Sequence, residues 1–184
     1  MRLTDLLQQH HEEIVGKWFD AIIAMYPAGS AEFLAKQKDR FRNPVGYTTR
    51  ASIEAVFDEI TGSMDSGELR RALDDIVRVR AVQEFTAAEA VGFVFLLKPL
   101  LREVFQKHLG DQILRQEIVD EMVDLETRID QVAMLTFDKY MECREQLHEV
   151  RTKEIRSRSA NLIDSLNAGS CVSKCKGEPF NDDA

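Results

Sequence analysis

Apolar residues recur at intervals of three and four positions along most of the chain, which is the period of an amphipathic α-helix. No extended run alternates polar and apolar residues, as a half-buried β-strand would require. Two local motifs mark helix starts. Asn43 precedes Pro44, which suits a capped first turn, and Thr86 precedes Glu89 at capping-box spacing. The pattern predicts an all-α helical bundle.

Other residues predict where individual helices begin and end. Thr4 is the expected N-cap of the first helix, and a short helix is expected over about residues 31–41. Gly46 follows the Asn-Pro start and should permit a close helix crossing. Pro99 should kink the helix that begins after Thr86, and Gly110 should end it.

Two arginines interrupt an apolar stretch in the middle of the chain. If residues 66–83 form one helix, an apolar stripe runs along it. Arg80 projects into this stripe about 40° from Ile76, Gln83 lies about 20° from Ile76 on the other side, and Arg78 points nearly the opposite way. We therefore expect Arg80 and Gln83 to be buried and Arg78 to be solvated. The stripe consists of Leu69, Ala72, Leu73, Ile76 and Val79.

The C-terminal half contains a long segment without proline or glycine, from Gln112 to about Ser165. As one helix it would be about 80 Å long, whereas a compact domain of this size is only about 40 Å across. Its apolar residues step by threes and fours, as in a coiled coil. We expect a homodimer whose seam includes Tyr140, Cys143, Leu147 and Val150.

Composition restricts the class of protein. The chain has 184 residues, of which 44% are hydrophobic, and its net charge is -8, so it can fold as one domain. Acidic and basic residues are mixed, which argues against a nucleic-acid partner. The most apolar run, residues 91–101, is too short to span a bilayer, and the N-terminus lacks a signal sequence, so we expect a cytoplasmic protein without membrane insertion.

The cysteines near the C-terminus allow a second interpretation. Cys171 and Cys175 have CxxxC spacing within a tail, residues 166–184, that we expect to be flexible. The pair could serve a redox or metal-handling accessory protein, although a zinc site prefers four ligands. Cys143 could form an interchain disulfide, but a free buried thiol is the commoner outcome in a reducing compartment.

No catalytic motif is present, and we expect neither an enzyme nor a bound cofactor. A haem-binding sensor stays open as an alternative, although spacing does not distinguish among the histidines. Arg80 and Gln83 have two interpretations: a structural ion pair or cap, or a pocket for a small anion or metabolite.

Three segments resemble one known family. They are FLAKQKDRFRNPVGYTTR, DDIVRVRAVQEFTAAEAVGFVFLLK and FDKYMECREQLHEVRTKEIRSR, and they resemble, in this order, the N-terminal domain family of the RsbT co-antagonist protein RsbRD. Within them RNPVG, IVRVRAVQEFT and YMECRE keep consistent spacing. The resemblance covers roughly residues 3–160.

The resemblance implies a globin-like, haem-free input domain over residues 1–160 that dimerises and signals along its C-terminal helix. In RsbR-type proteins the output is a STAS domain of the stressosome. Only about 20 residues follow the long helix here, so we expect no STAS output domain. The expected function is a non-catalytic signal-sensing or regulatory module that acts on an unidentified regulatory protein.

Overall fold

The computed structural model describes residues 3–37 and 39–173, and it describes their side chains except at 111–112 and 167–173. These residues form helices and no strand, so the all-α prediction is confirmed within that range. The helices are α1 (Leu3–Gln9), α2 (His11–Ile23), α3 (Ala28–Lys36), α4 (Pro44–Thr61), α5 (Ser66–Val82), α6 (Ala87–Phe95), α7 (Leu97–Leu109), the 3₁₀ helix η1 (Gly110–Leu114) and α8 (Gln116–Ser173).

The chain divides into two units, Met1–Arg144 and Glu145–Ala184, and the boundary falls within α8. The first unit contains α1 to α7 and the first part of α8, and the second contains the rest of α8. None of the helices described is long and apolar enough to cross a membrane.

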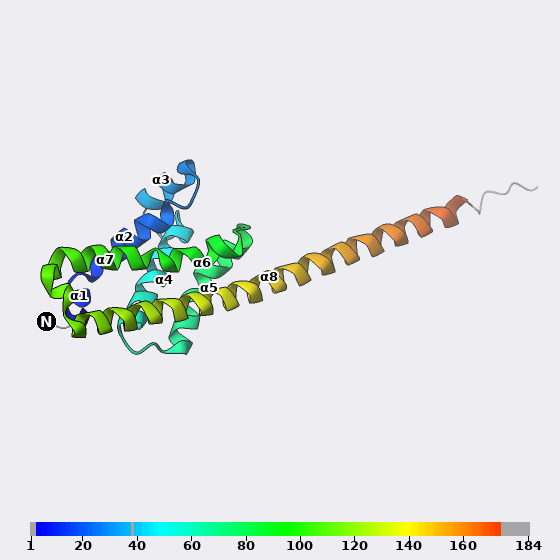
Figure 1. Cartoon of the computed structure of the whole chain (residues 1–184). Coiled ribbons are helices and arrows are strands. Elements are labelled where there is room, and N and C mark those ends of the chain that lie inside the picture. Colours follow the sequence, from blue (N-terminus) through cyan, green and yellow to red (C-terminus); the bar gives the residue numbers. More distant parts are fainter. Residues whose placement is uncertain (1–2, 38, 174–184) are drawn as a thin grey trace, which may run out of the picture. The chain divides into compact units, whose positions relative to one another are not determined.

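Helix α2 organises the first unit, because it packs against both α4 and α7, while α4 lies along α5 (Figure 1). Each of these helices contributes large side chains that are fully buried, and burying one such apolar side chain stabilises the fold by about 1.5–3 kcal/mol. The aromatic side chains that are fully buried in this core are Trp18, Phe57, Phe93 and Phe105. Arg80 is buried among residues of the same core.

The predicted helix start at Asn43 is confirmed, but the role predicted for Gly46 is wrong. The side chain of Asn43 is buried and accepts a hydrogen bond of 2.8 Å from the amide of Gly46. The Asn43 amide group donates to the carbonyls of Leu34 and Gln37 at 2.9 and 2.8 Å. A Cβ atom on Gly46 would lie 2.2 Å from Asn43 Nδ2, so the glycine makes room for the capping side chain rather than for a crossing helix.

The N-terminal part of the prediction needs two corrections. The first helical segment is divided at His10 into α1 and α2, and Thr4 lies inside α1 rather than capping it. The short helix expected over residues 31–41 begins and ends earlier, as α3, because Pro27 supplies an extended N-cap position.

The sequence signals around α6 and α7 correctly predicted where these helices begin and end. Thr86 and Glu89 form the expected capping box. Helices α6 and α7 are separated at Leu96, close to Pro99, which has no N–H to offer the carbonyl of Phe95 four residues earlier. Gly110 ends α7 with φ of 50°, a conformation that favours glycine.

Polar contacts attach the first part of α8 to α4, α5 and α7 within the first unit. These contacts join residues that are distant in sequence. They are Lys98–Asp130 (2.7 Å), Arg102–Glu126 (2.6 Å), Arg128 Nη1 to the carbonyl of Gly62 (2.9 Å) and Lys139–Asp74 (2.7 Å).

Candidate functional site

The last turn of α5 places a guanidinium group in the core. Arg80 is 0% exposed, as the helical periodicity predicted. Its Nη1 donates a hydrogen bond of 2.9 Å to the carbonyl of Glu89 in α6. Within the described residues, Nε and Nη2 are buried and have no hydrogen-bond partner. Buried donors without partners are rare in native proteins, because each carries a desolvation cost of about 1–3 kcal/mol.

Aromatic rings surround this guanidinium. The centre of the group lies 4.8 Å from the ring centroid of Phe93 and 5.0 Å from that of Phe85, within the range of cation–π attraction. The indole N–H of Trp18 donates to the carbonyl of Phe93 at 2.8 Å, and Tyr26 meets Phe85 edge to face. We call Tyr26, Phe85 and Phe93 the aromatic cage of Arg80.

The cage lacks a carboxylate that could neutralise Arg80 by direct contact. Burial lowers the pKa of Arg80, and the more distant Tyr26 and Glu89 offset part of this effect. Burial likewise raises the pKa of Tyr26, while the charge of Arg80 opposes that rise. The Glu89 carboxylate is occupied by the capping box, where it accepts hydrogen bonds from Thr86. The positive charge is therefore held by a carbonyl and two ring faces.

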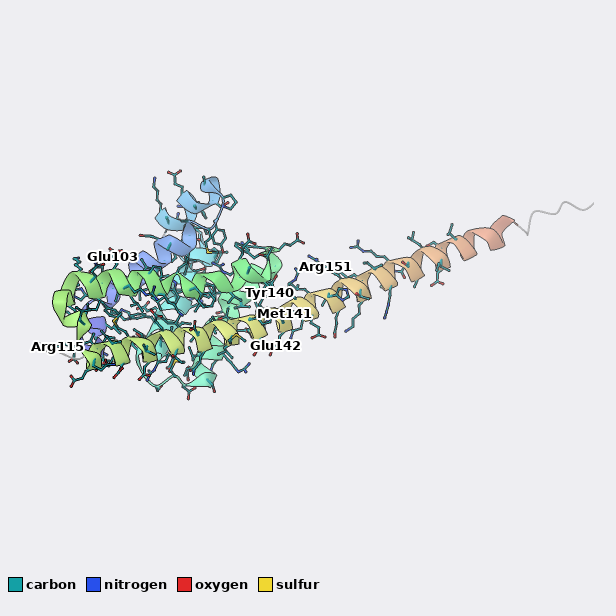
Figure 2. All side chains as sticks on the ribbon, viewed as in Figure 1. Glu103, Arg115, Tyr140, Met141, Glu142 and Arg151 are labelled. Atoms are coloured by element: carbon teal, nitrogen blue, oxygen red, sulfur yellow. The ribbon has the colours of Figure 1, made fainter. Side chains whose placement is uncertain are left out.

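The loop between α5 and α6 connects the cage to α8. The backbone N–H of Phe85 donates to the carbonyl of Arg80 at 3.2 Å, and the carbonyl of Phe85 accepts a hydrogen bond from the hydroxyl of Tyr140. Glu84, beside Phe85, has φ of 62°, which is uncommon for a residue other than glycine. Phe85 therefore contacts Arg80 through its ring and, through its carbonyl, Tyr140, which Figure 2 marks on α8.

The structure separates Gln83 from Arg80, contrary to the prediction that both are buried. Helix α5 ends at Val82, and Gln83 takes the C-cap position with an exposed side chain. Gln83 instead lines an open surface pocket of about 420 Å³, together with Tyr26 of the cage. Tyr26 therefore belongs both to the pocket and to the surroundings of Arg80.

The four residues predicted to form a dimer seam have different environments. Tyr140 and Cys143 are 4% and 6% exposed, because other residues of the first unit cover them, and Cys143 is the free buried thiol expected of it. Burial raises the pKa of the Cys143 thiol. In the second unit, Leu147 is half-buried and Val150 is 54% exposed.

Cys171 and Cys175 lie outside the residues whose side chains the structure describes. The sequence pattern also missed Phe85 and Phe93 as neighbours of Arg80, and Tyr26 and Tyr140 as partners of Phe85. The aromatic residues read as ordinary core, and only their contacts with a buried charge distinguish them.

Comparison with protein families matches residues 12–155 to the RsbT co-antagonist protein rsbRD N-terminal domain. The chain belongs to this family, and the resemblance found in the sequence is confirmed. The family suggests a regulatory domain in stress signalling, and it is not a known enzyme family. Comparisons with curated proteins and with solved structures gave no match.

Proposed function

We propose that this chain is a non-catalytic, cytoplasmic signal-sensing module in which Arg80 binds a small anion and changes the packing of α8. The observation that carries this proposal is a fully buried arginine with two unpartnered donors inside an aromatic cage. Membership of a family of regulatory stress-signalling domains supports the same function.

The chemistry of the free donors defines the ligand. Nε and Nη2 form one edge of the planar guanidinium, and their two N–H groups suit the paired oxygens of a carboxylate or phosphate. A bound anion would satisfy both donors and neutralise a charge that is costly to bury. The proposed ligand is therefore a small carboxylate or phosphate.

The pocket beside Gln83 is the proposed route to Arg80. It opens to solvent, and Tyr26 contributes to its lining. Tyr26 also contacts Phe85 edge to face, with ring centroids 5.4 Å apart. Rotation of the Tyr26 ring would open the cage from the side of the pocket. Gln83 would then meet the ligand at the surface rather than in the core.

Transmission to α8 would use the hydrogen bond between Phe85 and Tyr140. An anion at Arg80 competes with the Phe85 ring for the guanidinium, so the loop that carries Phe85 adopts a second position. A ligand that prefers one of two packings shifts their populations by its difference in affinity. The two proposed states differ in how Tyr140 connects α8 to Phe85.

We propose that the chain forms a homodimer whose subunits have a globin-like fold, and that this dimer carries the output of the module. Exposed apolar residues lie along α8 in both units, at spacings compatible with helix–helix packing. Those in the first unit are Val119, Val123, Met134, Phe137 and Met141, and those in the second are Val150, Ile155, Leu162, Ile163 and Leu166. Leu147 and Val150 stay in the proposed seam, whereas Tyr140 and Cys143 act inside each chain.

Native mass spectrometry of the full chain, purified from its own source, tests this function. A dimer with a reproducible extra mass that mild denaturation releases is expected from the wild type and absent from Arg80→Met. Arg78→Met is the matched control, because Arg78 lies on the same helix with an exposed side chain. Bare polypeptide mass in every sample would contradict the anion site.

Trp18 provides a second measurement in solution. It is the single tryptophan of the chain, and it binds the carbonyl of Phe93 in the cage. Titration with phosphate or acetate is expected to change its fluorescence in the wild type and in Arg78→Met, but not in Arg80→Met. An equal response in all three proteins would place the anion elsewhere.

A further inference from the structure

Two histidines and a glutamate from distant parts of the sequence meet at one corner of the first unit. His10 lies between α1 and α2, Glu13 is in the first turn of α2, and His108 is in the last turn of α7. One ligand atom from each residue lies within 4.8 Å of the others. The rings of His10 and His108 have centroids 3.9 Å apart, and Nδ1 of His10 lies 3.4 Å from Oε2 of Glu13.

Of the three residues, His108 gives the clearest indication of a binding site. Its Nε2 is buried, and none of the described residues forms a hydrogen bond with it. A buried ring nitrogen without a partner is unusual, because imidazole nitrogens bind readily to hydrogen-bond partners or to metals. The neighbouring side chains keep the site reachable, since those of His10 and Glu13 are 18% and 33% exposed.

We propose that His10, Glu13 and His108 bind one divalent transition-metal ion, with Zn²⁺ as the best fit. Imidazole nitrogen and carboxylate oxygen are common zinc ligands, and a set of three leaves a fourth position for water. Ligand atoms around tetrahedral zinc lie about 3.3 Å apart, given metal–ligand distances of about 2.0–2.1 Å. Side-chain rotations would have to bring the three ligand atoms to this spacing.

The charges around the site allow a cation to enter. Glu13 accepts ion pairs from Lys17 and Lys107 at 3.2 and 3.6 Å, and these lysines would have to release it. Lys17 keeps a carboxylate partner, because Glu103 lies 2.8 Å from its Nζ. The Lys107 side chain is 59% exposed and free to turn into solvent. Displacing the two lysines therefore leaves no buried charge unpaired.

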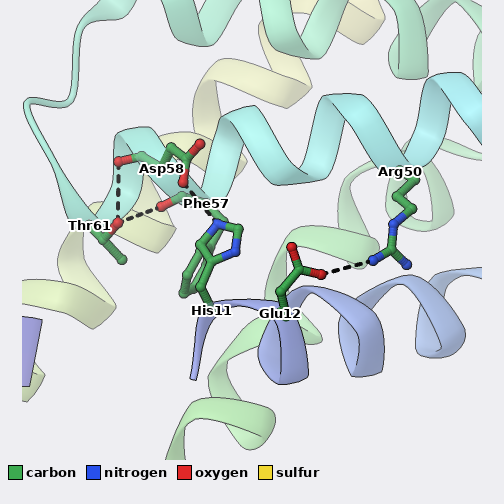
Figure 3. Close-up of polar contacts among 6 residues, drawn as sticks. All are labelled: His11, Glu12, Arg50, Phe57, Asp58 and Thr61. Carbon is green, nitrogen blue, oxygen red and sulfur yellow. Dashed lines mark hydrogen bonds and ion pairs between the residues drawn. The ribbon is translucent and has the colours of Figure 1, made fainter. Parts of the chain in front are cut away.

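A neighbouring cluster of similar composition is a poorer site. His11, Glu12 and Glu54 also have ligand atoms within 4.8 Å of one another. However, Figure 3 shows that His11 is paired with Asp58, at 2.9 Å, and Glu12 with Arg50, at 3.4 Å. In this cluster the histidine nitrogen already has a carboxylate partner. A variant at His11 is therefore a control of matched chemistry.

A metal at the proposed site would connect the junction of α1 and α2 to the end of α7. That end leads directly into Gly110 and η1, before α8 begins. Because the ligands converge only in the folded chain, metal binding should stabilise the native state.

Calorimetric titration of the chelator-treated full chain with Zn²⁺ alone, at pH 7.5, tests the site. One equivalent is expected to bind and to raise Tm. His108→Ala and His10→Ala should each weaken binding by at least the roughly 10–100-fold that the loss of an outer-shell partner costs. Circular dichroism of the metal-free variants checks that both fold, and Glu13→Gln serves as a third variant of nearly unchanged size.

Controls separate this site from the other candidate ligands. His11→Ala and the double variant Cys171→Ser, Cys175→Ser are expected to bind Zn²⁺ like the wild type. Co²⁺ should give the absorption of nitrogen and oxygen ligation, without thiolate charge transfer. The proposal is overturned if the wild type binds no Zn²⁺, if His108→Ala and His10→Ala bind as tightly as the wild type, or if binding is lost with His11 or the cysteine pair.

Discussion

Two arginines on opposite faces of α5 have opposite environments. On the outer face, Arg78 is 58% exposed and its Nε donates to Asp74 at 2.7 Å, while Asp74 also pairs with Lys139 of α8. On the inner face, Arg80 is 0% exposed and has a carbonyl and two aromatic rings instead of a carboxylate. Only two positions along the helix separate an arginine paired with a carboxylate from one that has buried, unpartnered donors.

Both faces connect α5 to α8, but the physical basis of the connection differs. The outer contact between Asp74 and Lys139 is a partly exposed ion pair, and such pairs contribute only about 0–1 kcal/mol. The inner contact runs through Phe85 to Tyr140 and includes a charge whose burial costs several kcal/mol. The inner contact is therefore the costlier of the two.

The largest effect is expected from Arg80→Ala. Truncation leaves a cavity in the cage and removes the hydrogen bond to Glu89, so the free energy of unfolding should fall by roughly 3 kcal/mol. Arg80→Met fills most of the same space without a charge to desolvate, and its stability should stay within about 1 kcal/mol of the wild type. Urea denaturation measures both.

These two substitutions separate the roles of Arg80. If methionine costs as much as alanine, the guanidinium is a structural partner and the anion site loses its basis. Arg78→Ala is the control on the outer face, where a loss below about 1 kcal/mol is expected from a broken surface pair.

Tyr140→Phe should have the next largest effect. It removes one hydroxyl and leaves the carbonyl of Phe85 without its partner, which costs about 1–2 kcal/mol in a buried setting. The change should also disconnect the cage from α8, so that phosphate still alters Trp18 fluorescence but no longer alters dimer dissociation. Analytical ultracentrifugation with and without phosphate measures the second quantity.

Tyr47→Phe is the matched control, because Tyr47 is 48% exposed. If Tyr140→Phe left the anion response of the dimer intact, transmission through Phe85 would be excluded.

On the outer face, Asp74→Asn should lower the free energy of unfolding by no more than about 1 kcal/mol. It removes the ion pairs with Arg78 and Lys139, both of which involve partly exposed side chains. Phosphate should still change Trp18 fluorescence and dimer dissociation, because the inner contact is unaffected. A loss of either response would show that the outer face also transmits the signal.

Sequence signals that act within a few residues predict the local structure correctly. The caps at Asn43 and Thr86 were predicted because both partners of each bond lie three residues apart. The burial of Arg80 followed from helical periodicity alone. The burial predicted for Gln83 is wrong because helical periodicity assumes that the helix continues through this residue. Helix α5 instead ends at Val82.

Contacts between distant segments could not be read in this way. The bond from Tyr140 to Phe85 joins residues 55 positions apart, and His108 meets His10 only because α7 packs on α2. Spacing along one helix cannot reveal such pairs, since they depend on how the helices are arranged. For the same reason, spacing along α8 cannot reveal that the first unit covers Tyr140 and Cys143.

The smallest predicted effect is the loss, at acid pH, of the stability that Asp74 contributes on the outer face. Burial would raise the pKa of Asp74, but hydrogen bonds from Lys139 and Arg78 outweigh it, so the pKa in the folded chain lies below its ordinary value. The unfolded chain then binds a proton more readily than the folded chain. This contribution to stability is present above the ordinary pKa of about 4 and is lost as the pH falls through the lower, folded value.

The difference in unfolding free energy between wild type and Asp74→Asn should therefore be largest near pH 7 and shrink below about pH 4. Urea denaturation at several pH values measures it, and taking the difference removes the contribution of the other carboxylates. Arg80→Met should keep the wild-type dependence on pH in this range, because Arg80 stays charged throughout it. A difference for Asp74→Asn that does not change with pH would show that the outer pair contributes no charge-dependent stability.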